Sequence, residues 1–199
     1  MRIAPSRPRG RRPGRDDTRG TIREAAAQLF AASGYDGVSL RAVARAADVD
    51  PALVHHYFTS KADLYCQAAF GTQWDVEEFV RDILRGHRDQ VGRRAAKAFL
   101  DRWDTDDDQH REYLSTLTRT AERGRHALTE MFAREVFTPI SSSFGHNNAP
   151  YRGQLAASTL LGMMVSRHEL GLPLLSSLSL RALAAPLGAT LQHYLVDAW

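Results

Sequence analysis

The sequence predicts an all-α protein with an N-terminal group of short helices and a larger helical C-terminal part. Apolar residues recur at the three- and four-residue spacing of a helical face along most of the chain. No segment has the sustained alternation of a strand, and no apolar runs are joined by a hairpin turn. The 43% hydrophobic and 25% charged residues are ordinary for a folded globular protein.

Positive charge is concentrated at the N-terminus. Residues 1–61 contain 11 Lys and Arg against 6 Asp and Glu, whereas residues 62–199 contain 15 against 17. Residues 1–16 are rich in Arg, Pro and Gly and have no apolar period, which predicts a disordered basic arm. A basic end suits contact with a polyanion, although a solubilising tail would have the same composition.

The cysteine count and hydropathy predict a cytoplasmic protein. A single cysteine, Cys66, excludes an internal disulfide and a zinc site built from cysteines. No run approaches the roughly 18 apolar residues that span a bilayer, so we expect no membrane segment. The arginine pair at positions 11 and 12 is not followed by an apolar stretch, so it is a poor export signal.

Residues 17–65 are predicted to form the first domain, which begins with two helices. Thr18 can cap the first helix, and Gly34 can end it in the left-handed conformation that glycine tolerates. Ser39 can cap a short second helix that ends near Ala46. The apolar face of the first helix consists of Ile22, Ala25, Ala26, Leu29 and Phe30.

A third, brief helix is predicted after a second capping signal. Asp50 stands at the capping position, and Pro51 follows at the first helical position, where a missing N–H costs nothing. Thr59 or Ser60 can cap a fourth helix, which the apolar pattern extends from Lys61 toward Leu84.

Residues 66–199 are predicted to form a second helical domain. Its interruptions are the acidic run at 104–108, Gly124, the loop at 145–150 and the Gly-Leu-Pro sequence at 171–173. Helices are accordingly expected near 90–103, 107–120, 123–142, 151–170 and 179–196.

The second and third helices have the size of a helix-turn-helix. Ser39 to Phe58 is about the length that such a unit needs, and the first helix can buttress it. A helix-turn-helix places its second helix in the major groove of DNA. Other small helical subdomains have helices of the same length, so the periodicity alone leaves DNA binding open.

The amino-acid sequence of this region resembles the N-terminal domain of the TetR family of bacterial transcriptional regulators. The similarity lies in Ile-Arg-Glu-Ala-Ala-Ala-Gln-Leu-Phe at 22–30, in the sequence from Gly34 to Ala44, and in the sequence from Val49 to Leu64. It covers about residues 18–65 without a gap. In the C-terminal part, the sequences at 160–171 and 191–195 look like the last helices of many members.

The resemblance implies a homodimeric repressor that binds a palindromic operator in double-stranded DNA and is released by a small-molecule effector. It implies no enzymatic activity, cofactor or metal. The segment from Pro51 to Tyr57 would then enter the major groove, Tyr57 would reach a phosphate, and Lys61 would contact the DNA backbone. The expected DNA-binding residues are Arg41, Arg45, Pro51, Ala52, His55, His56, Tyr57 and Lys61.

This recognition helix contains no Arg, Asn or Gln for bidentate base contacts. Thymine methyl groups, histidine contacts and DNA shape are therefore expected to supply sequence selectivity. His55 stands where the family often has a tyrosine. As an alternative, either histidine is an exposed residue that makes no contact with DNA. The arginine-rich arm is a candidate for an adjacent minor groove.

The C-terminal domain is expected to provide the dimer interface and the effector pocket. Two broad apolar faces predict the interface residues Leu160, Leu161, Met164, His168, Leu183, Leu187, Leu191 and Tyr194, with an ordinary intrachain core as the alternative. Aromatic and methionine side chains predict the pocket residues Phe70, Trp74, Phe99, Trp103, Met131, Phe132 and Met163, each of which also suits a plain core.

The fourth helix follows the recognition helix directly, so effector binding is expected to shift it and to change the spacing of two recognition helices. An enzyme is disfavoured because the sequence has no His-Glu-x-x-His pair and no Gly-rich phosphate loop. Three alternatives remain: a cation at the acidic run 106–112, a redox-sensitive Cys66, and a helical scaffold that has lost DNA recognition.

Overall fold

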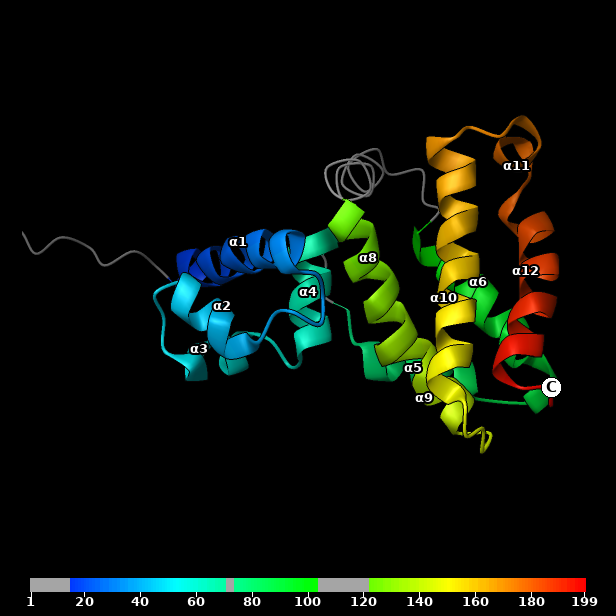
Figure 1. Cartoon of the computed structure of the whole chain (residues 1–199), viewed down its shortest axis with the longest axis horizontal. Helices are drawn as coiled ribbons and strands as arrows, with labels where there is room; N and C mark the ends of the chain where they lie inside the picture. The colour runs from blue at the N-terminus through cyan, green and yellow to red at the C-terminus, as the bar shows by residue number, and fades with distance from the viewer. Residues whose placement is uncertain (1–14, 71–73, 104–121) are drawn as a thin grey trace, which may run out of the picture.

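The computed structural model describes residues 15–70, 74–103 and 122–199, and the regular structure of these residues is entirely helical. The predicted all-α class is therefore confirmed. A group of four helices, α1 to α4, lies at one end of an elongated molecule, and α8 lies between this group and the long helices α10 and α12 (Figure 1). The predicted helix at 107–120 and most of the predicted arm at 1–16 lie outside the described residues.

The N-terminal unit consists of four helices around a small apolar core. Its helices are α1 (Arg15–Ser33), α2 (Leu40–Ala46), α3 (Pro51–Tyr57) and α4 (Lys61–Phe70). α1 packs against α2 and α4, and α2 packs against α3. Ile22, Ala26 and Phe30 of α1 are buried, as the helical period predicts, and they meet Val43 of α2 and Val54 of α3 in the same core.

Local capping signals set the ends of these helices. The Ser39 hydroxyl accepts a hydrogen bond from the Ala42 amide at 3.1 Å, and the Asp50 carboxylate accepts one from the Ala52 amide at 2.7 Å. Gly34 ends α1 with a φ of 73°, which a residue with a side chain adopts only under strain. The expected caps and stop are therefore confirmed at these positions.

The first helix begins earlier than predicted. α1 starts at Arg15, so Thr18 lies inside the helix and does not cap it. The sequence Arg-Asp-Asp at 15–17 contains no helix breaker, and acidic residues favour the first turn of a helix. The predicted arm therefore overlaps the start of α1.

The prediction of one long helix from Lys61 to Leu84 is wrong. α4 ends at Phe70, and α5 (Val76–Leu84) is a separate helix. Trp74 and Asp75 between them are not helical, and the Asp75 carboxylate accepts a hydrogen bond from the Glu78 amide at 2.8 Å. This bond gives α5 its own N-cap. The helical stretch that follows the recognition helix is therefore short.

The C-terminal body agrees with most of the predicted segments. η1 (Arg88–Gln90) is a short 3₁₀ turn, whereas η2 (Phe132–Phe137) and η3 (Val165–Glu169) are π-helical turns. The short helix α11 was not predicted. The remaining helices are α6 (Val91–Trp103), α8 (Glu122–Met131), α9 (Thr138–Ser142), α10 (Ala149–Met164), α11 (Pro173–Ser177) and α12 (Leu180–Leu195).

The π-helical turn η2 continues α8 into α9 and packs against α10. The Thr138 hydroxyl donates a hydrogen bond to the Ala133 carbonyl at 2.7 Å across the widened turn. Gly153 of α10 faces this point, where a Cβ would lie 2.6 Å from the Thr138 hydroxyl oxygen and 2.7 Å from the Ala133 carbonyl oxygen. The glycine is thus required for α10 to approach η2 this closely.

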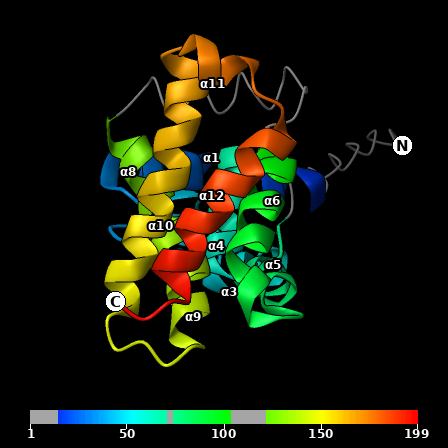
Figure 2. The same cartoon turned by 90° about the vertical axis from the view of Figure 1, so that its right-hand side faces the viewer.

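Two glycines also allow α6 and α12 to pack side by side (Figure 2). A Cβ at Gly92 would collide with the Gln192 amide nitrogen and the Gly188 carbonyl oxygen, and a Cβ at Gly188 would lie 2.9 Å from the Arg93 Cα. The obstacles are backbone atoms, which a side-chain rotation cannot clear. In addition, the Gln192 side chain accepts a hydrogen bond from the Gly92 amide at 2.8 Å.

Within the three described ranges, no helix combines the length and the hydropathy that a membrane crossing requires.

The close approach of α6 and α12 yields a stability prediction. Gly92→Ala is expected to lower the free energy of unfolding by about 1–3 kcal/mol because the two backbones must separate. Gly20→Ala is the matched control, since a Cβ at Gly20 of α1 would meet nothing within 4 Å. The control is expected to raise stability by about 0.5–1 kcal/mol through the better helix propensity of alanine. Urea unfolding followed by circular dichroism measures both, and equal stability of the two variants would contradict the tight contact.

Candidate DNA-binding surface and its support

Helix α3 presents most of its side chains to solvent. Val54 is fully buried, and it fixes the inner face of the helix together with Phe58, which follows directly. The exposed residues are Pro51, Ala52, Leu53, His55 and His56. The structure therefore places four expected DNA-binding residues on one accessible surface and adds Leu53, which is 38% exposed and which sequence reasoning missed.

The other expected DNA-binding side chains flank this helix. Arg41 and Arg45 are exposed on α2. Tyr57 is half-buried, and its ring meets the His56 ring edge-on with 5.1 Å between centroids. The exposed side chains at 41, 45, 51–53, 55 and 56 provide basic and apolar groups on α2 and α3.

Lys61 begins α4 and is half-buried. Its ammonium nitrogen lies over the ring of Tyr35, 4.3 Å from the centroid. Burial lowers the pKa of Lys61 below its usual value, and the negative charge of Asp36 is the main influence in the opposite direction. The cation is therefore partly desolvated and held against an aromatic face, where a cation–π attraction stabilises it.

A buried polar network supports the corner between α3 and α4. The Asp63 carboxylate accepts hydrogen bonds from the Thr59 amide at 2.9 Å, the Thr59 hydroxyl at 3.3 Å and the Gln67 side chain at 2.7 Å. Gln67 in turn accepts a hydrogen bond from Arg19 of α1 at 2.6 Å. The Ser60 hydroxyl caps α4 by accepting from the Asp63 amide at 3.0 Å. This network joins α1 and α4 to the end of the recognition helix.

Sequence reasoning missed the roles of Asp63, Gln67 and Arg19. The Ser60-Lys-Ala-Asp start of α4 resembles a capping box with Asp at the third helical position, and this signal could have identified Asp63. The partners Gln67 and Arg19 leave no local signal because they are 48 residues apart in the chain.

The turn after α1 attaches the N-terminal unit to the body. The Tyr35 hydroxyl donates a hydrogen bond to the Glu135 carboxylate of η2 at 3.0 Å. Asp36 pairs with Arg134 at 2.5 Å, and its amide donates to Glu130 at 3.4 Å. Burial, followed by the negative charge of Glu135, raises the pKa of Tyr35 far above its usual value. The tyrosine therefore remains a hydrogen-bond donor at every physiological pH.

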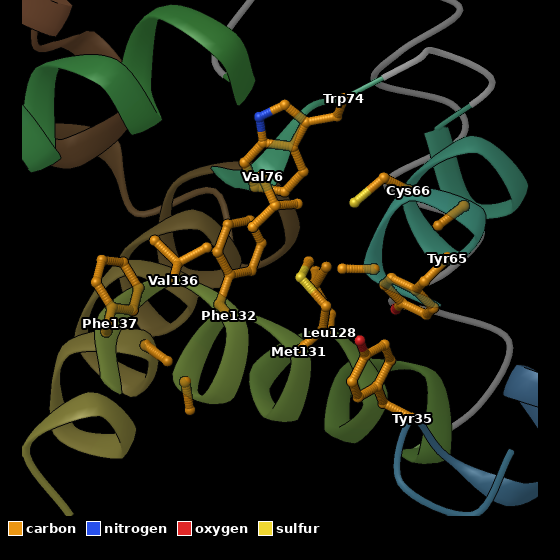
Figure 3. Close-up of a cluster of buried hydrophobic side chains, with 14 of the residues drawn as sticks. Tyr35, Tyr65, Cys66, Trp74, Val76, Leu128, Met131, Phe132, Val136 and Phe137 are labelled. Atoms are coloured by element: carbon orange, nitrogen blue, oxygen red, sulfur yellow. The ribbon is translucent and has the colours of Figure 1, made fainter. Parts of the chain in front are cut away.

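An aromatic and sulfur-containing cluster fills the body next to this joint (Figure 3). The Phe132 ring lies 5.5 Å from Trp74 and 5.4 Å from Phe99, measured between centroids. Met131 is fully buried, and Met163 is buried on α10, which packs against η2. The structure thus gathers five of the expected pocket residues in the interior, whereas the side chains of Phe70 and Trp103 lie outside its described part.

The expected dimer residues fall into two groups. Leu160 and Leu191 have no exposed surface within one chain, and Leu183 and Leu187 are also buried, so these leucines pack mainly inside the protomer. The residues that retain surface for a partner are Leu161, Met164, His168 and Tyr194. Helical periodicity did not distinguish the two groups, because burial inside the chain and burial by a partner require the same spacing.

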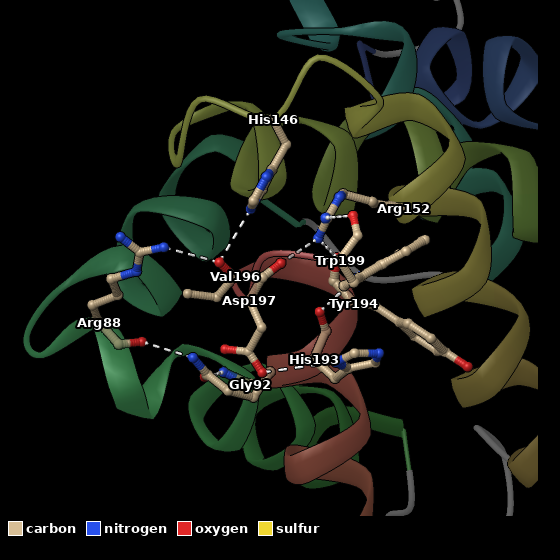
Figure 4. A network of polar contacts seen from close by, with 10 residues as sticks. Arg88, Gly92, His146, Arg152, His193, Tyr194, Val196, Asp197 and Trp199 are labelled. Carbon is tan, nitrogen blue, oxygen red and sulfur yellow. Dashed lines mark hydrogen bonds and ion pairs between the residues drawn. The ribbon is translucent and has the colours of Figure 1, made fainter.

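A buried arginine fastens α10 to the last turn of α12 and to the residues that follow it (Figure 4). The Arg152 side chain is 1% exposed and donates hydrogen bonds to the carbonyls of Tyr194 at 2.8 Å and Asp197 at 2.9 Å. It also donates to the Asn148 side chain at 2.8 Å, and its guanidinium lies 4.3 Å from the ring centroid of Trp199. The hydrogen-bonded guanidinium therefore holds the end of α12 against α10.

The alternative sites have little support. Burial raises the pKa of the Cys66 thiol well above its usual value, which suppresses the reactive thiolate. The acidic run at 106–112 lies outside the described residues.

Two family profiles match the chain. The profile described as "Bacterial regulatory proteins, tetR family" matches residues 22–68, and the profile described as "Tetracyclin repressor-like, C-terminal domain" matches residues 89–195. The first match contains the whole surface formed by α2, α3 and the start of α4.

The chain is also similar to several solved structures. A TetR-family regulator from Streptomyces coelicolor is 33% identical over 94% of this chain and 99% of its own, with a TM-score of 0.55. NalD, described as the secondary repressor of the MexAB-OprM multidrug efflux pump in Pseudomonas aeruginosa, is 21% identical over 92% of this chain and 99% of its own, with a TM-score of 0.37. A structure from a Shewanella species, described as a tetR family transcription regulator, is 20% identical over 89% of this chain and 96% of its own, with a TM-score of 0.37.

The Asp63 network yields a stability prediction for the turn between α3 and α4. Asp63→Ala leaves the buried Gln67 and the Thr59 amide without their acceptor, so unfolding free energy is expected to fall by about 2–3 kcal/mol. Asp50→Ala, which removes one exposed capping bond, is the control and is expected to cost about 1 kcal/mol. Urea unfolding at a fixed protein concentration measures both. An Asp63→Ala loss no larger than that of the control would show that the network is unimportant.

Proposed function

Because the chain belongs to the TetR family of bacterial regulatory proteins, we propose that it is a transcriptional repressor whose homodimer binds a palindromic DNA operator. The observation that carries this proposal is the accessible face of α3, which lies next to two exposed arginines on α2 and the lysine that opens α4. A short helix with an open face and flanking cations is the arrangement that a helix-turn-helix needs in the major groove. The proposal includes no enzymatic activity and no cofactor or metal.

Base recognition is assigned to the open face of α3. Pro51, Ala52 and Leu53 provide apolar contacts of the kind that read thymine methyl groups, and His55 and His56 provide hydrogen bonds. Tyr57, Lys61 and the α2 arginines Arg41 and Arg45 hold the phosphate backbone on either side. The basic arm at 1–16 is proposed to reach an adjacent minor groove.

Dimerisation is assigned to the exposed side of α10 and α12. The accessible parts of Leu161, Met164, His168 and Tyr194 form the proposed contact, and the buried leucines beneath them keep the two helices together. A two-fold dimer matches the symmetry of a palindrome and presents one α3 to each half-site.

Release by a small apolar effector is assigned to the cluster around Phe132. Trp74 and Phe99 contact this ring, and Met131 and Met163 are buried in the same core. Phe70 and Trp103 stay proposed members of the pocket. An effector that binds one arrangement of these side chains better than another shifts the protein toward that arrangement. Because α4 and α5 are separate helices that flank Trp74, the effector is proposed to move them against each other. The repressor is proposed to act in the cytoplasm, where its DNA lies.

The proposed function is tested by DNA binding of the purified full chain. A fragment from the region upstream of its own gene is compared with scrambled DNA at two salt concentrations. Tight, salt-sensitive and sequence-selective binding by a dimer is the expected result. If the fragment fails, selection from random duplexes identifies an operator elsewhere. A selection that also enriches no sequence would contradict the proposal and favour a helical scaffold.

The Lys61 phosphate contact predicts a specific change in salt dependence. Lys61→Ala is expected to lower operator affinity about tenfold, which corresponds to about 1.4 kcal/mol. It is also expected to reduce the slope of log K against log salt by about 1, because one fewer counterion is released. Lys97→Ala is the matched control, since this lysine is exposed on α6 and pairs with Asp101. Equal salt slopes for the two variants would show that Lys61 does not contact a phosphate.

A further inference from the structure

We infer that Tyr35 is a positioning residue for the Lys61 phosphate contact, and that the C-terminal body sets its position through the hydrogen bond from Tyr35 to Glu135. The inference rests on the proposed DNA binding and goes beyond it, because it identifies the path from the body to a DNA-contacting group. Lys61 contacts DNA, whereas Tyr35 acts through Lys61.

The ring of Tyr35 is packed between aromatic side chains of α1 and α4. Tyr35 is fully buried, and its ring stacks on Phe30 with 5.9 Å between centroids and meets Tyr65 edge-on at 5.5 Å. The Lys61 ammonium lies 4.3 Å from the centre of the same ring. A long lysine side chain in solution samples many rotamers, and a cation–π contact restricts it to few. The ring therefore prepares the ammonium for a phosphate and lowers the entropy that is lost on binding.

The other end of Tyr35 belongs to the body. Its hydroxyl donates to Glu135 of η2 at 3.0 Å, and the adjacent Asp36 pairs with Arg134 and donates its amide hydrogen to Glu130. Two consecutive residues of one turn are thus held by three residues of α8 and η2. Gly34, with a φ of 73°, begins this turn and brings both residues to the body.

The segment that holds Tyr35 also contacts the aromatic cluster. η2 carries Glu135 on the side toward Tyr35, while Phe132, Val136 and Phe137 of the same turn are buried in the body (Figure 3). A π-helical turn contains an extra residue, and a change to α-helical register displaces all of its side chains together. A rearrangement around Phe132 therefore moves Glu135, and with it Tyr35 and the ammonium of Lys61. This path does not require α4 to act as a long lever.

Glu135 itself provides a matched pair of variants. Glu135→Gln and Glu135→Ala remove the same negative charge, which acts on Lys61, but the glutamine retains an acceptor for the Tyr35 hydroxyl. Operator affinity of Glu135→Ala is expected to be three- to tenfold below that of Glu135→Gln. The difference is expected to vanish when Lys61→Ala is added to both, because residue 135 affects operator affinity only through Lys61. A difference that persists without Lys61 would overturn the inference.

Tyr35→Phe tests the same path from the other side. It keeps the ring and removes the bond to Glu135, so it is expected to lower both the affinity and the salt slope in the direction of Lys61→Ala. Tyr65→Phe removes a buried hydroxyl from the same aromatic cluster and is the control for lost stability. A Tyr35→Phe salt slope equal to that of Tyr65→Phe would overturn the inference.

Hydrogen exchange distinguishes the proposed coupling from a purely structural role of Tyr35. Operator DNA is expected to slow amide hydrogen exchange in residues 132–137 of the wild-type protein, since coupling between two sites is reciprocal. In Tyr35→Phe this effect is expected to be lost while the DNA complex still forms at saturating DNA. Exchange that is unchanged in the wild-type complex would overturn the inference but leave the proposed function intact. A wild-type protein that binds no operator would overturn both.

Discussion

The hydrogen bond between Tyr35 and Glu135 fixes how the N-terminal helices lie on the C-terminal body. Its donor is fully buried, and loss of the acceptor within the folded protein would cost about 1–3 kcal/mol. The neighbouring pair of Asp36 and Arg134 is exposed and contributes to orientation more than to stability. Tyr35 also packs on Phe30 of α1 and Tyr65 of α4. The Asp63 network of α4 in turn holds Thr59, which follows α3. The accessible surface of α3 thus has a defined place relative to the body.

Much of the fold could be predicted from the sequence where the signals are local. The caps at Ser39 and Asp50 each involve residues two or three positions apart, and a short sequence contains all that such a bond needs. The break between α4 and α5 was missed because an apolar period continues through it, although the Asp75-Val-Glu-Glu sequence is a recognisable helix start. The π-helical turn η2 could not be predicted, since its shape depends on Gly153 and on contacts with α10.

The candidate site was predictable only in part. The exposed residues of α3 follow from the resemblance in that region, and their DNA contacts stay predictions. Tyr35 and Glu135 are 100 residues apart, and their pairing has no local pattern in a single sequence. The leucines at 160, 183 and 191 illustrate a second limit, because a helical period predicts that a residue is buried but not which chain buries it. The structure narrows the available surface on α10 and α12 to the half-exposed and exposed positions.

The Arg152 contacts have a consequence for how the C-terminal segment can vary. Its guanidinium is satisfied at Tyr194 and Asp197 by carbonyl oxygens, which every amino acid provides. Substitution of these two residues therefore leaves the hydrogen bonds in place, provided that the backbone keeps its path. Only the stacking on Trp199 depends on the identity of a side chain in this segment. The path of this segment beside α10 is therefore set through its main chain by Arg152, and it tolerates a change of side chain at positions 194 and 197.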